Sequence, residues 1–417
     1  MSATVRPNHV SAIDLDAGPG LMEATISGTN AVRAGVMFDG TRQHGPSTVL
    51  IHEGRIIGVE TGRFEPPHDV PVLDFGADAF LMPGLIDAHT HLVFDASATS
   101  TAAVTGDYDR PALLDRMRAT AASVLRAGIT TVRDLGDRDY VTLQLRAEFA
   151  ERPERGPHLL TAGPPLTTHG GHCYFLGGEA TGDDLAGAIR ERYERGCDVV
   201  KIMASGGQMT QGSSLEQNQY SAAELATAVE TAHRLGMPVA AHAHGVQSIR
   251  NAVVTGVDFI EHCSFLRDGK VVADADLLDA IAAAPTVVSG TFGFSRLPEG
   301  KPGLLALLDD MRAAFAELAR RDARVVVGTD GGVSPIKPHN VLPYAVADDL
   351  RQIGFTPEQA LAVVTSRAAD ALGLGWNKGR ISEGADADLL VVSGSPLADP
   401  ARLRDVRAVF RSGIRVR

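Results

Sequence analysis

From residue 80 to residue 374 the chain alternates short apolar runs with amphipathic stretches of helical length. The stretch 113–127, for example, ends at Gly128, a common helix stop, and the apolar run 129–133 follows at once. About eight such units occur, and this alternation predicts parallel strands joined by right-handed crossovers. Eight units close best into a (β/α)8 barrel. The alternative, a doubly wound open sheet, would carry a glycine-rich phosphate loop after its first strand, and the sequence has none there.

Regions rich in short β segments flank the barrel region on both sides, and Glu53-Gly54 predicts a tight hairpin turn in the first of them. Two β-rich stretches around one long α/β stretch suggest that they pair into a single small β-sandwich domain. The predicted strands are 31–38, 47–52, 55–60, 70–73, 389–393, 406–410 and 414–416. We therefore divide the chain into an N-terminal arm (1–30), a composite β-sandwich domain (31–79 and 375–417) and the barrel (80–374).

Charge and composition argue against several classes of function. The net charge of −12 argues against a nucleic-acid partner, because binding a phosphate backbone requires clustered Lys and Arg. No apolar run approaches the about 18–20 residues of a membrane span, and the first residues lack the pattern of a secretory signal. Three well-separated cysteines argue against a disulfide framework and fit a reducing cytoplasm. We expect a soluble cytoplasmic enzyme.

Titratable residues end several of the predicted strands. They are His89 and His91 on the first strand, Lys201 on the fourth, His242 and His244 on the fifth, His262 on the sixth and Asp330 on the eighth. The C-terminal ends of barrel strands meet at one mouth, and two histidines two residues apart on a strand point to the same side. A single histidine at a strand end is usually structural, but the joint pattern predicts a shared metal site. Imidazole and carboxylate ligands favour zinc, with manganese, iron or nickel as less favoured occupants.

Lys201 differs from the other strand-end residues, because an ammonium group cannot bind a cation. It lies in the apolar run 198–203 (DVVKIM), where burial disfavours the charged form and should lower its pKa. A neutral amine can react with carbon dioxide to give a carbamate, N6-carboxylysine, which is able to bridge two metal ions. The alternative is a lysine that forms a salt bridge with a nearby aspartate.

On these motifs the chain resembles the amidohydrolase superfamily, over nearly all of residues 31–417. The motifs look closest to the branch that contains imidazolonepropionase-like and Xaa-Pro dipeptidase-like enzymes. That branch includes metal-dependent peptidases and amidases of N-acylated amino acids, among them carboxypeptidase-like enzymes and ochratoxin-type amidases. The motifs are 80–91 (FLMPGLIDAHTH), 200–207 (VKIMASGG), 240–245 (AAHAHG), 260–263 (IEHC) and 328–331 (GTDG).

The resemblance implies a binuclear hydrolase of amide or peptide bonds, acting on a small N-acyl amino acid or a dipeptide-like substrate. One divalent metal ion would be held by His89, His91 and Asp330. A second would be held by His242 and His262, with carboxylated Lys201 bridging the two. Two cations lower the pKa of a bridging water to give hydroxide, and Asp330 would accept its proton and pass it to the leaving amine. A homo-oligomer is also implied by the resemblance alone.

Two long polar segments after the third and fourth strands are expected to contact the substrate. They are 167–172, with His169 and His172, and 208–220, which ends at Tyr220. The resemblance implies that His172 or His169, together with Tyr220, polarises the scissile carbonyl or holds a substrate carboxylate. The alternative for each is a residue of the loop surface. His244 faces the same side as His242 and is either a ligand or a substrate contact, and we prefer a contact.

Two other interpretations compete with this one. A mononuclear deaminase or a cyclic-amide hydrolase of the imidazolonepropionase type is one enzyme alternative. Family deaminases usually carry His-x-x-Glu after the fifth strand, whereas the third position after His242 is Gly245, and Lys201 favours two metals. A non-catalytic barrel scaffold predicts gaps among the ligands, and the sequence has none. Arg133 and Asp134, at the end of the second strand, are expected to form a structural ion pair.

Overall fold

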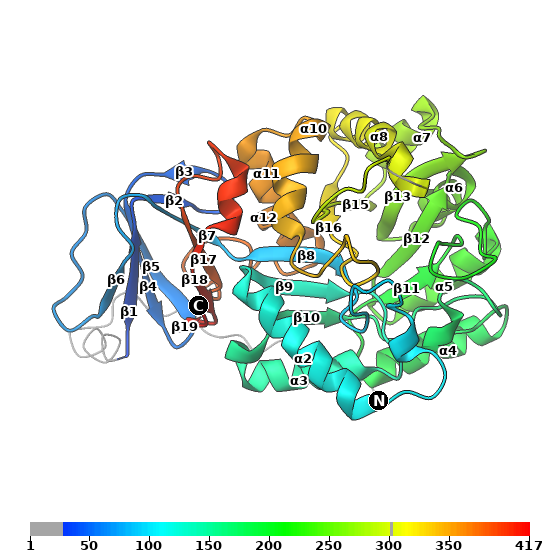
Figure 1. Ribbon diagram of the computed structural model, residues 1–417, viewed down its shortest axis with the longest axis horizontal. Coiled ribbons are helices and arrows are strands. Elements are labelled where there is room, and N and C mark those ends of the chain that lie inside the picture. The colour runs from blue at the N-terminus through cyan, green and yellow to red at the C-terminus, as the bar shows by residue number, and fades with distance from the viewer. Residues whose placement is uncertain (1–27, 301–302) are drawn as a thin grey trace.

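Figure 1 shows two neighbouring parts, a small β region and a larger region in which helices surround strands. The computed structural model describes residues 28–300 and 303–417. The N-terminal arm expected over residues 1–30 therefore lies almost entirely outside the described residues.

The larger region is the expected barrel of eight parallel strands. Its strands are β8 (Leu85–Thr90), β9 (Ile129–Asp134), β10 (His158–Thr161), β11 (Val200–Met203), β12 (Val239–Gly245), β13 (Phe259–Arg267), β15 (Val287–Thr291) and β16 (Val325–Gly328). Strands β8–β10 form one sheet, and the other five follow one another in a second. Isolated bridges between Leu166 and Ile202 and between Thr90 and Gly331 join the two sheets on both sides. The prediction of a (β/α)8 barrel is confirmed.

Helices cover the outside of the barrel (Figure 1). They are α2 (Arg110–Arg126), α3 (Val141–Glu151), α4 (Asp184–Arg195), α5 (Ala222–Arg234), α6 (Val246–Thr255), α7 (Ala275–Ala283), α8 (Leu308–Arg320), α9 (Leu342–Tyr344), α10 (Arg351–Ile353), α11 (Pro357–Val363) and α12 (Ser366–Ala371). Within the described ranges, no helix is both long enough and apolar enough to cross a membrane.

Local sequence signals explain where several helices begin and end. Ser221 and Glu224 form a capping box at the start of α5, with Ser221 Oγ accepting the Glu224 N–H at 3.2 Å. Gly196, with φ of 84°, ends α4 in the left-handed conformation that glycine adopts without strain. A helix pair is expected from the sequence over 357–372, and the structure has α11 and α12 there, separated at Thr365, where the backbone leaves the helical conformation (φ −134°, ψ −97°).

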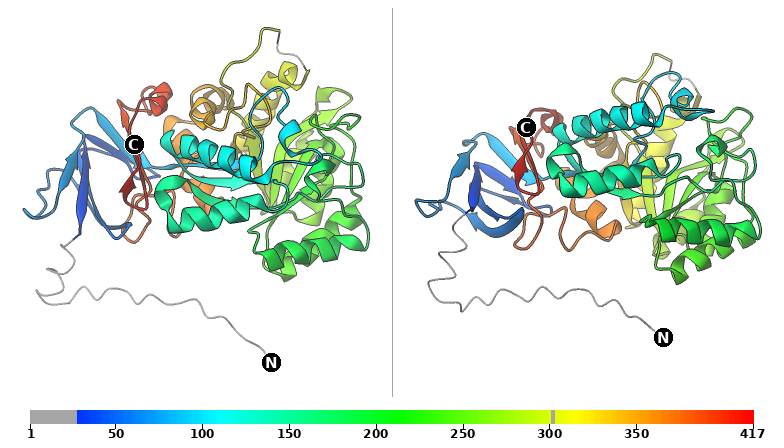
Figure 2. Two further views of the ribbon diagram at one scale, coloured as in Figure 1. Left: turned by 60° about the horizontal axis from the view of Figure 1, so that its bottom comes forward. Right: turned by 90° about the horizontal axis from the view of Figure 1, so that it is seen from below.

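Both ends of the chain build the small β region, which Figure 2 shows beside the barrel. One sheet has the order β5-β4-β1-β6 and the other the order β19-β18-β17-β7-β2-β3. Val32, Leu81, Leu389 and Phe410 belong to the apolar core that these strands share. The strands are β1 (Asn30–Ala34), β2 (Val36–Phe38), β3 (Gln43–His44), β4 (Ser47–His52), β5 (Arg55–Thr61), β6 (Val72–Asp74), β7 (Ala79–Pro83), β17 (Leu389–Ser393), β18 (Val406–Arg411) and β19 (Ile414–Arg415).

The β region corrects one predicted strand and bears out one predicted turn. The single strand expected at 31–38 is two strands, β1 and β2, which belong to different sheets. The chain crosses between the sheets at Gly35, where a Cβ atom would lie 2.0 Å from the carbonyl oxygen of Ala77. The hairpin turn predicted at Glu53-Gly54 joins β4 to β5, and both turn residues have positive φ.

The apolar run 80–82 leads toward the barrel but pairs within the β region. Strand β7 lies antiparallel to β17 and parallel to β2, and the barrel begins only at β8. The domain limit expected between residues 79 and 80 therefore falls inside β7, and the proposed division stays a prediction. Gly84 links the two parts, because its N–H donates to the carbonyl of Asp388 at 2.9 Å.

Candidate metal centre

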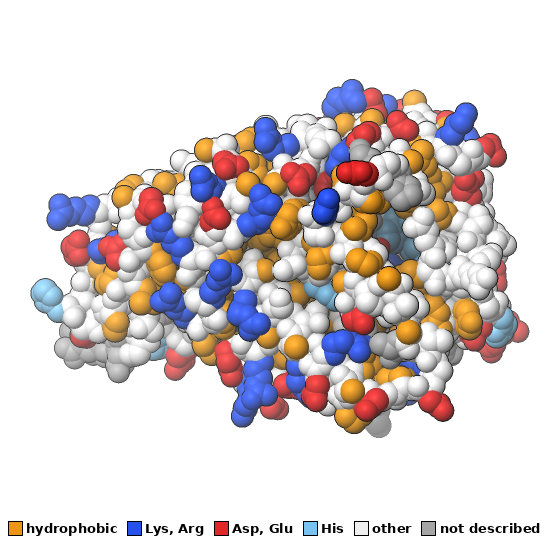
Figure 3. All heavy atoms as spheres, in the orientation of Figure 1, with side chains coloured by type: hydrophobic (Ala, Val, Ile, Leu, Met, Phe, Trp, Pro, Cys, Tyr) orange, Lys and Arg blue, Asp and Glu red, His pale blue; other side chains and the backbone are white. Residues whose placement is uncertain are grey.

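The six residues predicted as metal ligands lie together at the mouth of the barrel, where a cavity of about 680 Å³ opens. Figure 3 shows histidine side chains inside a hollow on this face. Its lining includes His91, His172, Lys201, His242, His244, His262 and Asp330. His89 is fully buried next to them, with its ring centroid 4.9 Å from that of His262. The convergence of strand ends thus gathers titratable groups from five strands.

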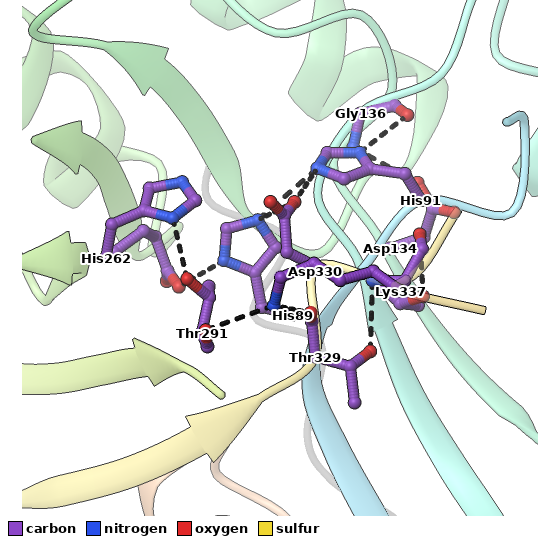
Figure 4. Close-up of polar contacts among 12 residues, drawn as sticks. His89, His91, Asp134, Gly136, His262, Thr291, Thr329, Asp330 and Lys337 are labelled. Atoms are coloured by element: carbon purple, nitrogen blue, oxygen red, sulfur yellow. Dashed lines mark hydrogen bonds and ion pairs between the residues drawn. The ribbon is translucent and has the colours of Figure 1, made fainter. Parts of the chain in front are cut away.

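His89, His91 and Asp330 form a first cluster (Figure 4). The Nε2 atoms of His89 and His91 are 3.3 Å apart. Oδ1 of Asp330 lies 3.5 Å from Nε2 of His89 and 3.4 Å from Nε2 of His91. Nδ1 of His89 donates to Glu261 at 2.8 Å, and Nδ1 of His91 donates to the carbonyl of Gly136 at 3.2 Å. Both Nε2 atoms are therefore acceptors that face a carboxylate oxygen. Three acceptors at these distances suit a shared cation.

His242, His244 and His262 form a second cluster, in which one ligand atom from each lies within 4.8 Å of the others. A neighbour holds one nitrogen of each ring: the carbonyl of Gly206 at 3.0 Å for His242, Ser264 Oγ at 2.9 Å for His244 and Thr291 Oγ1 at 3.0 Å for His262. Such contacts orient a ring and leave its second nitrogen for a metal. His244, which we expected to contact the substrate, has the geometry of a third ligand here.

Lys201 lies close to both clusters and has no partner of its own. Its Nζ atom is buried and forms no hydrogen bond to any described residue. Burial lowers the pKa of Lys201 to about 8, although Glu261 and Asp330 favour the ammonium form. The alternative salt bridge with an aspartate is absent from the described part of the chain, because no carboxylate lies within 4.0 Å of Nζ. An unpartnered buried amine of lowered pKa is the state that carbamate formation requires.

Burial also keeps five histidines of the site neutral, namely His89, His172, His242, His244 and His262. It lowers the pKa of His89 and His172 to about 4 and that of His244 to about 3. The pKa values of His242 and His262 are also lowered well below the usual histidine range, first by burial and then by neighbouring histidines. Neutral imidazole is the form that binds a metal ion, so these five rings need no deprotonation at neutral pH before they bind one.

Two ligand positions have a left-handed backbone, with φ of 67° at His262 and 55° at Asp330. Residues other than glycine adopt this conformation at a cost of about 1–3 kcal/mol, and such residues cluster at functional sites. Both side chains are thereby turned toward the clusters at the end of their strands. The surrounding structure holds these two residues in positions that an unstrained strand would not give.

The two histidines after the third strand separate clearly. His172 is buried and lines the cavity, with its ring centroid 4.8 Å from that of His242 and its Nδ1 without a hydrogen bond. The side chain of His169 is 74% exposed and lies 3.7 Å from Glu179. His169 does not line the cavity, so the expectation of a substrate contact there is not supported.

Tyr220 is also placed differently from our expectation. Its side chain is almost fully buried, it is absent from the cavity lining, and its hydroxyl donates to the carbonyl of Ala180 at 2.8 Å. The reason is local: Tyr220 directly precedes Ser221, which caps α5, and the side chain packs toward the loop before α4. The predicted catalytic contact of Tyr220 is therefore not supported by this arrangement.

Arg133 and Asp134 do not pair with each other. Arg133 forms an ion pair of 2.6 Å with Glu261, whereas Asp134 accepts the N–H groups of Leu92 and Gly136. Glu261 thus joins Arg133 to His89. It was not among the predicted site residues, although an acidic residue inside an apolar strand is a usable signal. Lys337, which lines the cavity, was also missed, since its loop carries no periodic pattern.

Known proteins resemble this chain in sequence and in fold. The sequence profile of the Amidohydrolase family matches residues 80–416. Ochratoxinase of Aspergillus niger is 25% identical over 450 residues, which cover 97% of this chain and 89% of that protein. Imidazolonepropionase of Cereibacter sphaeroides is 27% identical over 382 residues, covering 86% and 91%. A crystal structure of a Xaa-Pro dipeptidase with bound methionine in the active site is 24% identical and superposes with a TM-score of 0.82, covering 93% and 99%.

Proposed function

This chain belongs to the amidohydrolase family, as a metal-dependent hydrolase of C–N bonds, and we propose that it cleaves the amide bond of small N-acyl amino acids or dipeptides at two metal ions. The observation that carries the proposal is the pair of ligand clusters with the unpartnered Lys201 beside both. The name of one relative agrees with it, because a Xaa-Pro dipeptidase acts on dipeptides.

The described residues fit two cations. His89, His91 and Asp330 would hold one, and His242 and His262 would hold the other, with Lys201 as N6-carboxylysine contributing an oxygen to each. His244 would complete the second site or contact the substrate. Nitrogen and carboxylate ligands favour zinc, and manganese, iron and nickel accept the same set. Divalent cations, when bound, polarise a carbonyl group and lower the pKa of a water molecule.

The side chains around the clusters have distinct tasks in the proposed reaction. Asp330 is the general base and acid: its Oδ1 faces Nε2 of His91 at 3.4 Å, which leaves Oδ2 to accept a proton from water and pass it to the leaving amine. His172, a neutral imidazole that lines the cavity, would donate a hydrogen bond to the substrate carbonyl. Glu261 and the carbonyl of Gly136 keep the rings of His89 and His91 in the ligand orientation.

A substrate screen on metal-loaded protein tests this proposal. The protein is stripped with a chelator, reloaded with Zn²⁺, Mn²⁺, Fe²⁺ or Ni²⁺, and assayed against N-acyl amino acids, dipeptides and cyclic amides. We expect hydrolysis of the acyclic amides and about two equivalents of bound metal. Hydrolysis of cyclic amides alone, with one metal per chain, would identify the imidazolonepropionase-like alternative. A chain that binds no metal would leave the non-catalytic scaffold. Self-association and a cytoplasmic location stay predictions.

A further inference from the structure

Lys337 is a second buried lysine of the cavity, and the proposed reaction gives it no role. It is 9% exposed and lines the same cavity as the two ligand clusters. Its Nζ donates to the carbonyls of Thr329 at 2.8 Å and Thr291 at 3.1 Å, and lies 4.3 Å from the ring centroid of Phe294. An ammonium group has three donors, so one remains beyond these two bonds.

The position of Lys337 ties it to both clusters (Figure 4). Thr329 directly precedes Asp330, and Thr291 holds the ring of His262 through its hydroxyl at 3.0 Å. The ammonium group therefore sits beside the ligands without belonging to them. Asp330, Asp349 and Asp87 favour the ammonium form from a distance, Asp330 the most, yet no carboxylate of the described residues lies within the 4.0 Å of an ion pair with Nζ. Burial still outweighs these carboxylates and lowers the pKa of Lys337, so an anion in direct contact with the ammonium group would offset a remaining cost.

The wall next to Lys337 is apolar and aromatic. Phe292 and Phe315 meet edge to face with centroids 5.0 Å apart, and both line the cavity together with Met311 and Ile336. Such a wall accepts an apolar or aromatic side chain rather than a polar one. In an amino acid the carboxylate and the side chain leave the same carbon atom, so one ligand can reach the cation and the wall at once.

We propose that Lys337 binds the free carboxylate of the substrate's amino-acid half, whose bulky apolar or aromatic side chain packs on the wall of Phe292, Met311 and Phe315. The inference rests on the proposed amide hydrolysis and adds its substrate class: an amide whose leaving amine is an apolar α-amino acid with a free carboxylate. Lys337 is then a specificity-determining residue, because it does not touch the reacting bond.

Two matched substrates test the inference. N-acetyl-L-phenylalanine and N-acetyl-2-phenylethylamine contain the same amide bond and ring, and only the first has a carboxylate. In the metal-loaded wild-type protein we expect kcat/KM to favour the first by about 100-fold, the value of a hydrogen bond to a charged group. In Lys337→Met this ratio should fall to about 3-fold or less, mainly through KM. Equal losses for both substrates would indicate a structural role and overturn the inference.

Controls separate charge from folding and from the proposed reaction. Lys337→Gln removes the charge and keeps N–H donors on a side chain that is one atom shorter, so it should lose the same selectivity. Melting temperature and metal content check that both variants fold. Binding of 3-phenylpropanoate to metal-loaded protein, measured by calorimetry, needs no hydrolysis. If the protein cleaves neither amide but Lys337→Met binds 3-phenylpropanoate at least about 10-fold more weakly than wild type, the carboxylate site is supported and the proposed function is rejected. Unchanged affinity and selectivity would reject the site alone.

Discussion

Two of the three buried lysines in the described ranges, Lys378 and Lys201, have opposite surroundings. Lys378, at 3% exposure, lies where the β region meets the barrel, and its Nζ contacts Asp386 and Asp388 at 2.7 Å each. Lys201, at 1% exposure, lies at the mouth of the barrel, and its Nζ has no hydrogen-bond partner among the described residues. A buried charge that has its own counter-charges serves the fold. A buried amine that has none marks a place where something from outside completes the structure.

The remaining groups of the two regions follow the same division. At the junction, burial alone would raise the pKa of Asp388, but Arg411 and Lys378 outweigh it and lower the pKa to about 2, so the ion cluster stays charged. At the mouth, burial lowers the pKa of His89 to about 4 and that of His244 to about 3, so these rings stay neutral. At the junction, ion pairs compensate the buried charges. At the mouth, the buried histidines are neutral, which leaves nitrogen lone pairs available for cations.

Removal of Lys201 should have the largest effect on activity and little effect on stability. In Lys201→Ala we expect kcat/KM to fall by about 10³-fold or more, because both cations lose a shared ligand. Lys201→Met fills the same space with an apolar chain, and the metal-free variant should melt at the same or a higher temperature than metal-free wild type. Steady-state kinetics, metal analysis and thermal melting are the measurements.

Chemical rescue and a matched surface lysine are the controls for Lys201. Short carboxylates such as acetate should restore part of the activity of Lys201→Ala, since they can replace the carbamate. Lys270, an exposed lysine of the chain, should tolerate substitution by alanine with activity within about 2-fold of wild type. Full activity of Lys201→Ala without added carboxylate is the result that would contradict the assigned role.

Removal of Lys378 should lower stability strongly and leave activity nearly unchanged, the opposite of what we expect for Lys201. Lys378→Met leaves Asp386 and Asp388 without their shared cation, and we expect the free energy of unfolding to fall by about 3–5 kcal/mol. The folded fraction should retain wild-type kcat, because the junction is remote from the cavity. Arg402→Ala is the matched control: Arg402 is about half exposed in its pairs with Asp399 and Asp405, so its loss should cost at most about 1 kcal/mol. Urea unfolding measures the free energy of unfolding of both variants. Similar losses in Lys378→Met and Arg402→Ala would contradict the different roles of the buried and the exposed ion pairs.

The pH dependence of stability separates the two regions further. In the metal-free protein the pKa values of His89, His172 and His244 are lowered to about 4, 4 and 3, mainly by burial, from about 6.5 in the unfolded chain. Between these values the unfolded chain binds protons that the folded chain excludes. Stability therefore falls as the pH drops below about 6.5, by about 1.4 kcal/mol per pH unit for each histidine. Asp388 contributes stability that is present above about pH 4 and is lost only as the pH falls toward 2.

Urea unfolding at pH 7, 6 and 5, with and without a chelator, measures this difference. Bound metal should flatten the dependence, because it holds the histidines without protons until it is released. His158 lies near the junction, and its pKa is also lowered by burial, to about 3. His158→Asn should therefore reduce the dependence of the unfolding free energy on pH by the contribution of one histidine. It should leave unchanged the flattening of that dependence by bound metal. A metal-free protein equally stable at pH 7 and pH 5 would contradict the account of neutral buried rings.

The features that could be predicted from sequence are those that follow from period and topology. The alternation of elements predicts the barrel, the barrel places strand ends at one mouth, and the two-residue spacing puts His89 and His91 on one side. Period and topology were enough to expect the six candidate ligands at one end of the barrel. His244 was predicted to face this site by the same spacing, but its hydrogen bond to Ser264, which gives it the geometry of a ligand, depends on a neighbouring strand.

The features that could not be predicted depend on local departures from regular geometry. Strict alternation puts Glu261 and His262 on opposite faces of β13, yet both contact or approach His89, because the backbone at His262 turns to a φ of 67°. Lys337 lies in a loop, where no period relates sequence to side-chain direction. Gly35, which splits the predicted first strand, is required by a contact with Ala77 that only the packed β region creates.

Tyr220 extends the comparison to a neutral group and gives the smallest predicted effect. Like Lys378, it is buried with a partner of its own, the carbonyl of Ala180 at 2.8 Å. Tyr220→Phe should therefore lower the free energy of unfolding by about 1 kcal/mol, the net value of one hydrogen bond, with kcat/KM within about 2-fold of wild type. The substrate contact expected from the sequence predicts a larger loss, of about 10-fold or more in kcat/KM, at unchanged stability. Urea unfolding and kinetics on the same preparation distinguish the two accounts, because a structural hydrogen bond changes the free energy of unfolding and a substrate contact changes kcat/KM.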